Sequence, residues 1–226
     1  PTFTSNATFS AAENQTAIGT VTASDPEGDT LSFTISGSDI TIVSSSGLLE
    51  FASAPDFETQ TSYSVTVTVS DGTNTVTQDI TVNVTNVNDV APEFTSNATF
   101  SAAENQTAIG TVTATDAEGD DVTFTVSGSE MEITSAGVLT FATAPDYETV
   151  TSFTATVTAS DGTNSTTQDI TVNVTNVNDN SPVITSAAIF TAEENQTAIG
   201  TVIATDADGD DVTFTVSGSE LSITSA

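Results

Sequence analysis

The sequence contains no lysine, arginine or histidine, although 31 of its 226 residues are aspartate or glutamate. Carboxylates that folding brings together therefore have no cationic side chain to pair with. Two unit charges ~4 Å apart interact by about 4 kcal/mol at an effective dielectric constant of 20, so their repulsion would be strong without a bound cation. The absence of basic side chains also excludes electrostatic binding to nucleic acid or to anionic membrane surfaces.

Cysteine and long apolar runs are absent as well. Without cysteine the chain can form no disulfide, thiolate metal site or thiol nucleophile. A membrane-spanning helix needs about 18 or more consecutive apolar residues, and a signal peptide needs a basic segment before an apolar one. Neither pattern occurs, so we expect no membrane insertion in this segment, and any such element would lie outside this sequence.

One phrase occurs three times along the chain. The segment Ala12–Val21 returns as Ala103–Val112 and, with one substitution, as Glu193–Val202. The glutamate of this phrase recurs after 91 residues and then after 90, which is the size of a small independent domain. The chain is therefore a tandem array, and its function should be sought in what an array does.

Each repeat has the pattern of an all-β domain. Apolar and hydroxyl residues alternate over Tyr63–Ser70 and over Ile80–Val84, and the intervening turn Asp71–Asn74 predicts an antiparallel hairpin. Further short strands are predicted at Ile18–Ala23, Leu31–Ile35 and Leu48–Phe51, and no segment shows a helical period. About seven short strands in roughly 90 residues, separated by frequent turns, are typical of an immunoglobulin-like Greek-key β-sandwich.

Prolines mark the predicted domain boundaries. Repeat 1 is Pro1–Ala91, repeat 2 is Pro92–Ser181, and repeat 3 is Pro182–Ala226. Repeat 3 corresponds only to the first half of a domain, so we expect it to retain the early strands and to expose their apolar faces. We expect the native chain to continue past Ala226, and strand donation by another molecule is the alternative.

Five short motifs recur in the same order, and together they resemble the calcium-binding motifs of cadherin domains. They are the Glu of Ala-Glu-Asn, the Asp-x-Glu after a proline, the acidic Asp-x-Glu/Asp-Gly turn, the later Ser-Asp-Gly, and the linker Asn-Val-Asn-Asp before a proline. The resemblance covers the whole chain and implies calcium ions shared between successive domains. The linker departs from the family pattern at Asn86 and Asn176, which replace aspartate, and at Val90, which replaces asparagine.

The resemblance assigns ligands to two junctions and to one half-site. The first junction, between repeats 1 and 2, would use Glu13, Asp56, Glu58, the Val87 carbonyl, Asn88, Asp89, Asp116, Glu118 and Asp161. The second junction, between repeats 2 and 3, would use Glu104, Asp146, Glu148, the Val177 carbonyl, Asn178, Asp179, Asp206 and Asp208. The outer half-site of repeat 1 would use Asp25, Glu27 and Asp71, and suggests that another repeat preceded Pro1.

The chemistry of these residues favours calcium independently of the family. Calcium takes 6–8 oxygen ligands from carboxylates, carbonyls and amides, whereas magnesium demands near-octahedral geometry and retains water. Aspartate, asparagine and glycine also suit turns for reasons of backbone geometry, which is sufficient explanation for isolated residues such as Asp29 and Asp79. Turn geometry does not explain the recurring glutamates, so we assign those to the metal.

A second recurring pattern is the Asn-x-Thr sequon of N-linked glycosylation. A chain so rich in asparagine and threonine also produces such triplets by chance, and the outward-facing Asn83 and Asn173 are the best glycan candidates. The sequons lie at Asn6, Asn14, Asn83, Asn97, Asn105, Asn164, Asn173 and Asn195.

The sequence favours a calcium-rigidified extracellular shaft, belonging to a large cell-surface adhesin or a secreted filament whose chains associate with other copies. The near-identity of neighbouring repeats suggests a prokaryotic surface protein. Homophilic cell–cell adhesion is an alternative, although strand exchange through tryptophan is impossible because the chain has none. A glycosidase with paired carboxylates is the enzymatic alternative. We expect no enzyme, because the carboxylates recur in every repeat whereas an active site is usually a single constellation.

Overall fold

The computed structural model describes residues 1–224, and strands are the only regular secondary structure among them. The end of repeat 3 at Ala226 lies outside the described residues. No helix that could cross a membrane occurs in the described part of the chain.

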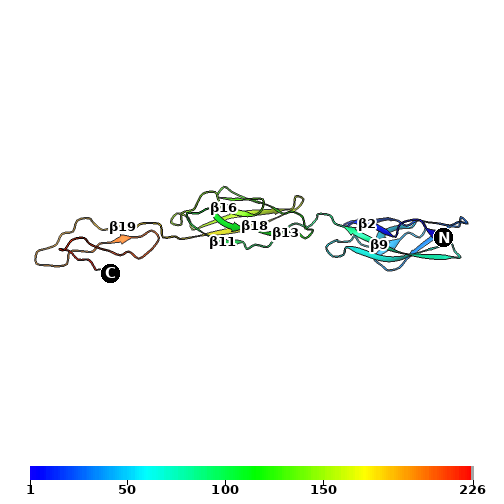
Figure 1. Cartoon of the computed structure of the whole chain (residues 1–226), viewed down its shortest axis with the longest axis horizontal. Helices are drawn as coiled ribbons and strands as arrows, with labels where there is room; N and C mark the ends of the chain where they lie inside the picture. The colour runs from blue at the N-terminus through cyan, green and yellow to red at the C-terminus, as the bar shows by residue number, and fades with distance from the viewer. Residues whose placement is uncertain (225–226) are drawn as a thin grey trace. The chain divides into compact units, whose positions relative to one another are not determined.

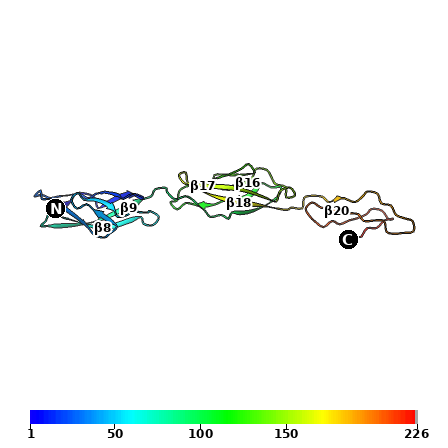
Figure 2. The same ribbon diagram turned by 180° about the vertical axis from the view of Figure 1, so that it is seen from behind.

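Repeat 1 folds into two facing sheets and one short strand pair, as an immunoglobulin-like sandwich requires. The larger sheet has the order β2-β9-β8-β5, the smaller has the order β3-β7-β6, and β1 pairs with β4. Strand β2 runs parallel to β9, and the two lie side by side in Figure 1, whereas β8 and β9 form the predicted antiparallel hairpin seen from behind in Figure 2. The strands are β1 (Thr2–Phe3), β2 (Thr8–Ala12), β3 (Ala17–Thr20), β4 (Ala23–Ser24), β5 (Ser32–Ile35), β6 (Ile40–Ile42), β7 (Leu48–Phe51), β8 (Ser62–Ser70) and β9 (Thr75–Thr85).

Repeat 2 reproduces this topology strand for strand. Its sheets have the orders β11-β18-β17-β14 and β12-β16-β15, and β10 pairs with β13. The strands are β10 (Glu93–Phe94), β11 (Thr99–Ala103), β12 (Ala108–Thr111), β13 (Ala114–Thr115), β14 (Thr123–Val126), β15 (Met131–Ile133), β16 (Val138–Phe141), β17 (Ser152–Ser160) and β18 (Ser165–Thr175). The predicted fold class is therefore confirmed in both repeats.

The predicted single strand Ile18–Ala23 is wrong, because the chain changes partners within it. Strand β3 ends at Thr20 after pairing with β7, and β4 begins at Ala23 and pairs with β1. Between them, the Val21 N–H donates to the Gly47 carbonyl, and the Thr22 carbonyl accepts from the Thr4 N–H. Alternation of side chains continues through this change of partner, so periodicity alone does not reveal it.

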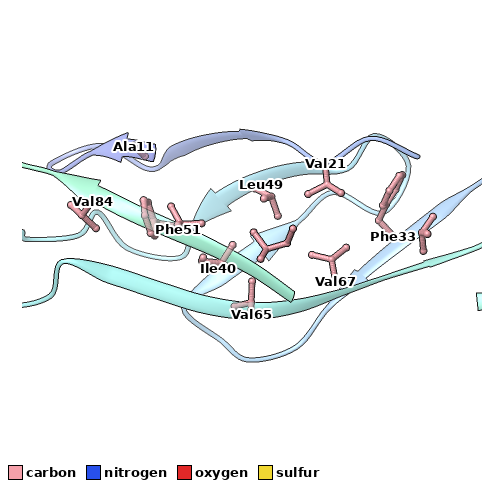
Figure 3. Close-up of a cluster of buried hydrophobic side chains, with 12 residues drawn as sticks. Ala11, Val21, Phe33, Ile40, Leu49, Phe51, Val65, Val67 and Val84 are labelled. Carbon is pink, nitrogen blue, oxygen red and sulfur yellow. The ribbon is translucent and has the colours of Figure 1, made fainter. Parts of the chain in front are cut away.

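The apolar residues of alternate positions fill the space between the two sheets. In repeat 1 the core includes the fully buried Leu49, Val67 and Ile80, together with aromatic side chains such as Phe33 (Figure 3). In repeat 2 the equivalent positions are Leu139, Val157, Ile170 and Phe124, among others. Fully burying an aliphatic side chain of this size contributes about 1.5–3 kcal/mol, so these cores are the main source of stability.

One glycine per repeat is required by close backbone contact. Gly47 has a φ of +72°, and a Cβ there would lie 2.1 Å from the carbonyl oxygen of Val21. Gly137 has a φ of +84°, and its Cβ would lie 2.2 Å from the carbonyl oxygen of Val112. Each glycine therefore lets the turn before β7 or β16 lie against the backbone that follows the neighbouring strand β3 or β12, where its carbonyl accepts the valine N–H.

Repeat 3 contains only one strand pair among its described residues, β19 (Val183–Ile184) with β20 (Ala204–Thr205). The other early strands that we expected are not formed, and the pairing in repeat 2 explains why. There β11, β12, β14 and β15 all pair with strands that follow Gly137, and repeat 3 has no counterpart of those strands in this sequence. Apolar side chains are correspondingly exposed, as with Ile189, which is 82% exposed.

The chain divides into two compact units that do not coincide with the repeats. The first unit is Pro1–Pro92 with Asp116–Asp121 and Asp161–Asn164, and the second is Glu93–Thr115, Val122–Ser160 and the chain from Ser165 onward. The first unit thus includes two acidic turns of repeat 2. All predicted ligands of the first junction lie in the first unit, and all those of the second junction lie in the second. The repeat boundaries stay predictions.

Candidate metal sites at the two repeat junctions

The recurring glutamate is buried in both complete repeats. Glu13 and Glu104 follow the outer strands β2 and β11, and each is only 3% exposed. The Glu13 carboxylate accepts hydrogen bonds of 2.7 Å from the N–H groups of Phe57 and Val87. Glu104 accepts the equivalent bonds from Tyr147 at 2.8 Å and Val177 at 2.7 Å. Each glutamate therefore ties the middle residue of an Asp-x-Glu motif to the linker.

At the first junction, carboxylates from four segments form a connected series of clusters. In each cluster the ligand atoms lie within 4.8 Å of one another, and neighbouring clusters share Glu58 or Glu118. Glu118 also accepts hydrogen bonds from the linker N–H groups of Asp89 at 3.0 Å and Val90 at 2.9 Å. The clusters are Glu13–Asp56–Glu58, Glu58–Asp89–Glu118 and Asp116–Glu118–Asp120.

Asp161 joins this site through amides, since it belongs to none of the described carboxylate clusters. Its Oδ1 accepts the N–H groups of Thr163 at 2.7 Å and Asn164 at 2.6 Å. The Asn164 amide donates to Asn88 Oδ1 at 2.8 Å, which connects the turn to the linker. Burial would raise the pKa of Asp161, but hydrogen bonds from Asn164, Thr163 and Asn88 outweigh it and lower the pKa.

Three carboxylate oxygens at the first junction are buried without a hydrogen-bond donor among the described residues. They are Asp116 Oδ2, Glu118 Oε2 and Asp161 Oδ2. A buried anionic oxygen is costly unless it is paired, hydrogen-bonded or bound to a metal. The donor set of carboxylate and amide oxygens is the set that calcium prefers. The residues present therefore fit a calcium ion.

The outer half-site of repeat 1 brings Asp25 and Asp71 close together around the first residue of this sequence. The amino terminus of Pro1 lies 3.2 Å from Asp25 Oδ2 and 3.8 Å from Asp71 Oδ2, and both aspartates are almost fully buried. Backbone hydrogen bonds from Asn74 and Thr73, with the nearby ammonium, lower the pKa of Asp71 to about 2. Asp25 and Asp71 match Asp116 and Asp161 by sequence, so the two acidic turns of the first junction recur at this half-site. Glu27 remains exposed and belongs to none of the described carboxylate clusters.

At the second junction, three carboxylates of one four-membered cluster converge on one amide. Glu104, Glu148, Asp179 and Asp208 form one cluster, and Asp206, Asp208 and Asp210 form another. The Asn180 side-chain amide donates to Glu148 at 3.1 Å, to Asp179 at 2.8 Å and to Asp208 at 3.2 Å. An amide has only two N–H donors, so three carboxylates share them. The first junction has Val90 at this position, which cannot donate through its side chain.

Burial, and then repulsion between carboxylates, raise the pKa of two junction glutamates. Burial raises the pKa of Glu58, and the charges of Glu13, Glu118 and Asp56 raise it further. Burial and the charges of Glu104 and Asp208 likewise raise the pKa of Glu148. The folded protein therefore holds protons at these sites more tightly than free glutamate does, as expected where anions gather without cations.

Some predicted ligands are not gathered into the clusters. Asp146 instead caps its own turn, accepting the Glu148 N–H at 3.1 Å and the Thr149 hydroxyl at 3.0 Å. Val87 and Val177 contact the glutamates through their N–H groups, and the ligand role of their carbonyls stays a prediction. Asn178 donates to Asp210.

Several residues that the structure brings to the junctions were not among the ligands assigned from the sequence. The acidic turn places Asp120 and Asp210 beside the predicted pairs, because the glycine before each has a positive φ and turns the chain back. The sequence feature that could have identified them is the aspartate at the fifth position of each Asp-x-Glu/Asp-Gly-Asp turn. The other residues are Asn14, Asn105, Asn164 and Asn180, which donate to the predicted ligands.

Comparison with known proteins places this fold among the cadherins. The Drosophila melanogaster protein "Protocadherin-like wing polarity protein stan" is 32% identical over 218 residues, which is 83% of this chain but only 6% of that protein. A family profile described as "Bacterial Ig domain" matches residues 1–85. The chain thus spans a small fraction of the curated relative that it matches.

Solved structures of cadherin repeats have the same fold. The crystal structure of mouse cadherin-23 EC22-24 superposes with a TM-score of 0.69 at 21% identity, covering 91% of this chain and 77% of that one. The structure of human CDH23 EC21-23 gives a TM-score of 0.69 at 24% identity, covering 92% of this chain and 80% of that one.

Proposed function

Because this chain is an array of cadherin-like domains, we propose that it is a segment of an extracellular shaft in which calcium holds successive repeats rigidly together. The shaft would belong to a large cell-surface adhesin or a secreted filament. Its partners would be calcium ions, the neighbouring repeats and other copies of the chain. No catalytic role is proposed, because the acidic clusters recur from junction to junction.

The residues that would hold calcium at the first junction are those of its three connected clusters. Glu58 and Glu118 are shared between clusters, so ions bound there would be linked through common ligands. A calcium ion supplies positive charge and 6–8 coordination positions for oxygen. The linker contributes Asp89, while Glu13 fixes the linker backbone through the Val87 N–H. Binding would therefore order the linker as well as neutralise the carboxylates.

The observation that carries this proposal is the set of three buried carboxylate oxygens, on Asp116, Glu118 and Asp161, that have no donor among the described residues. Such oxygens need a donor or a positive charge to offset the cost of their burial. The chain has no basic side chain that could play this part at the junctions. A metal cation is the remaining source of charge, and the oxygen-only donor set favours calcium over softer metals.

Calcium binding can be tested by isothermal titration calorimetry and by native mass spectrometry of the metal-free chain. We expect saturable binding of several calcium ions, with weaker binding of magnesium at the same concentration. The test variant carries two changes at the first junction, Asp116→Asn and Glu118→Gln, and is compared with the unmodified chain. It should bind fewer ions while leaving the second junction intact. Absence of calcium binding by the unmodified chain at millimolar concentration would refute the proposal.

A further inference from the structure

The asparagine after each recurring glutamate has an unusual backbone conformation. Asn14, Asn105 and Asn195 have φ values of 61°, 62° and 65°, and they are the only residues other than glycine with positive φ in the described chain. The left-handed region is costly for most side chains, and asparagine is among the few that tolerate it. The conformation recurs at all three equivalent positions and therefore belongs to the recurring phrase itself.

In the two complete repeats, backbone hydrogen bonds hold the chain at this asparagine and at the glutamate before it. The preceding Glu13 donates its N–H to the Thr85 carbonyl at 3.1 Å, and Asn14 donates its own to the Pro55 carbonyl at 3.0 Å. In repeat 2, Glu104 and Asn105 make the equivalent bonds to Thr175 at 3.1 Å and Pro145 at 3.0 Å. The backbone is therefore held between the end of the long strand and the loop that leads to the Asp-x-Glu motif.

The side chain of the asparagine reaches the linker. Asn14 Nδ2 donates to Asp89 Oδ2, and Asn105 Nδ2 donates to Asp179 Oδ2. Each acceptor belongs to one of the carboxylate clusters of its junction. The same amide is thus placed on the same linker aspartate in both repeats, although the sequences of the two linkers differ at Val90 and Asn180.

A neutral donor suits this position for an electrostatic reason. The amide fixes the aspartate without adding charge to the cluster, and a carboxylate that accepts one hydrogen bond still has lone pairs for a metal. Partners that orient a metal ligand in this way typically change metal affinity by ~10- to 100-fold when they are removed.

We propose that Asn14 and Asn105 are positioning residues that hold the linker carboxylates of Asp89 and Asp179 in their metal-binding orientation. The left-handed backbone is what directs each amide towards the linker. This inference rests on the proposed calcium function, and it assigns the asparagine of the recurring phrase a role distinct from that of the glutamate beside it.

The test compares two substitutions at Asn105 in the whole chain. Asn105→Gly keeps the left-handed backbone accessible and removes only the amide. Asn105→Asp keeps the size and the tolerance of positive φ but replaces a donor with a carboxylate that faces Asp179. Asn195→Gly is the matched control, because Asn195 has the same φ but makes no side-chain hydrogen bond to a carboxylate within residues 1–224.

Calcium affinity, ion count and the melting temperature in chelator are the readouts. We expect Asn105→Gly to weaken binding at the second junction by roughly 10- to 100-fold, with a chelated melting temperature close to that of the control. Asn105→Asp should weaken binding as well, although it adds a carboxylate that could otherwise serve as a ligand.

Three results would overturn the inference. Unchanged affinity in both variants would refute it while leaving the proposed function standing, and so would tighter binding by Asn105→Asp. An equal loss of melting temperature in calcium and in chelator would assign the asparagine a structural role only. If the unmodified chain binds no calcium, the proposed function fails first and the inference fails with it.

Discussion

Replacing Glu104 with glutamine is expected to destabilise repeat 2 by an amount that depends on calcium. The glutamate is 3% exposed, and both of its oxygens accept backbone N–H groups, from Tyr147 and Val177. Glutamine has only one acceptor oxygen. Its NH2 group would therefore face the second backbone N–H, and two donors cannot form a hydrogen bond with each other. One buried N–H is therefore left without a partner in Glu104→Gln, whether or not calcium is present.

The expected loss of folding stability in Glu104→Gln has two parts. Leaving a buried donor unsatisfied costs about 1–3 kcal/mol, and this part is expected in chelator as well as in calcium. Calcium at 100 times its dissociation constant stabilises the folded state by about 2.7 kcal/mol, and a 100-fold weaker site would retain only about 0.4 kcal/mol of this. The calcium-dependent loss is therefore about 2 kcal/mol, or roughly 8–16 °C in the melting temperature of a domain of this size.

Thermal unfolding followed by circular dichroism, with and without calcium, measures both parts. The matched control is Asp169→Asn, which removes the same charge from repeat 2 on the outer face of β18. There the Thr156 hydroxyl donates to Asp169 Oδ1 at 2.7 Å, an interaction that asparagine retains. The control should melt within a few degrees of the unmodified chain. An equal loss for Glu104→Gln in calcium and in chelator would refute the assignment of this glutamate to a metal site.

Three further predictions follow from the same structure. A protease that cuts after phenylalanine should cleave near Phe94 rapidly in chelator and slowly in calcium, and equal rates would mean that the linker is not ordered by metal. Gly137→Ala should destabilise more than Gly128→Ala by about 1–3 kcal/mol, since both have a φ of +84° but only Gly137 would place a Cβ against backbone; equal melting temperatures would contradict the close approach of Gly137 to Val112. In chelator, stability should rise as pH falls from 7 towards about 4.5, because carboxyls whose folded pKa is raised, such as Glu58 and Glu148, bind protons more tightly when folded. The stabilisation by calcium should shrink over the same pH range. Melting curves at constant ionic strength measure both effects, and a stability that falls as the pH falls in chelator would contradict the prediction.

Much of the fold follows from local patterns in the sequence. Alternation of apolar and hydroxyl residues predicts β8 and β9 and their hairpin, because both strands face one core on one side and solvent on the other. It does not predict that β2 pairs with β9 in parallel, since their contact depends on segments more than 60 residues apart. It also hides the change of sheet at Val21, where side-chain alternation continues while the hydrogen-bond partner changes.

The candidate sites are predictable in part for a similar reason. The resemblance to cadherin domains, which the comparisons confirm, identified the glutamates and aspartates whose types and spacing are distinctive. The supporting amides of Asn14 and Asn180 were missed, because asparagine is common in turns and its role depends on which carboxylate lies opposite in the folded chain. The assignment of these residues as calcium ligands stays a prediction.

The central claim is that calcium bound at the junctions makes the array rigid, and small-angle X-ray scattering of the whole chain tests it most directly. The maximum dimension and the flexibility of the particle should be compared in saturating calcium and in chelator at constant ionic strength. We predict a longer and stiffer particle in calcium, and a shorter average with broad flexibility in chelator. Identical scattering in the two conditions would contradict the account.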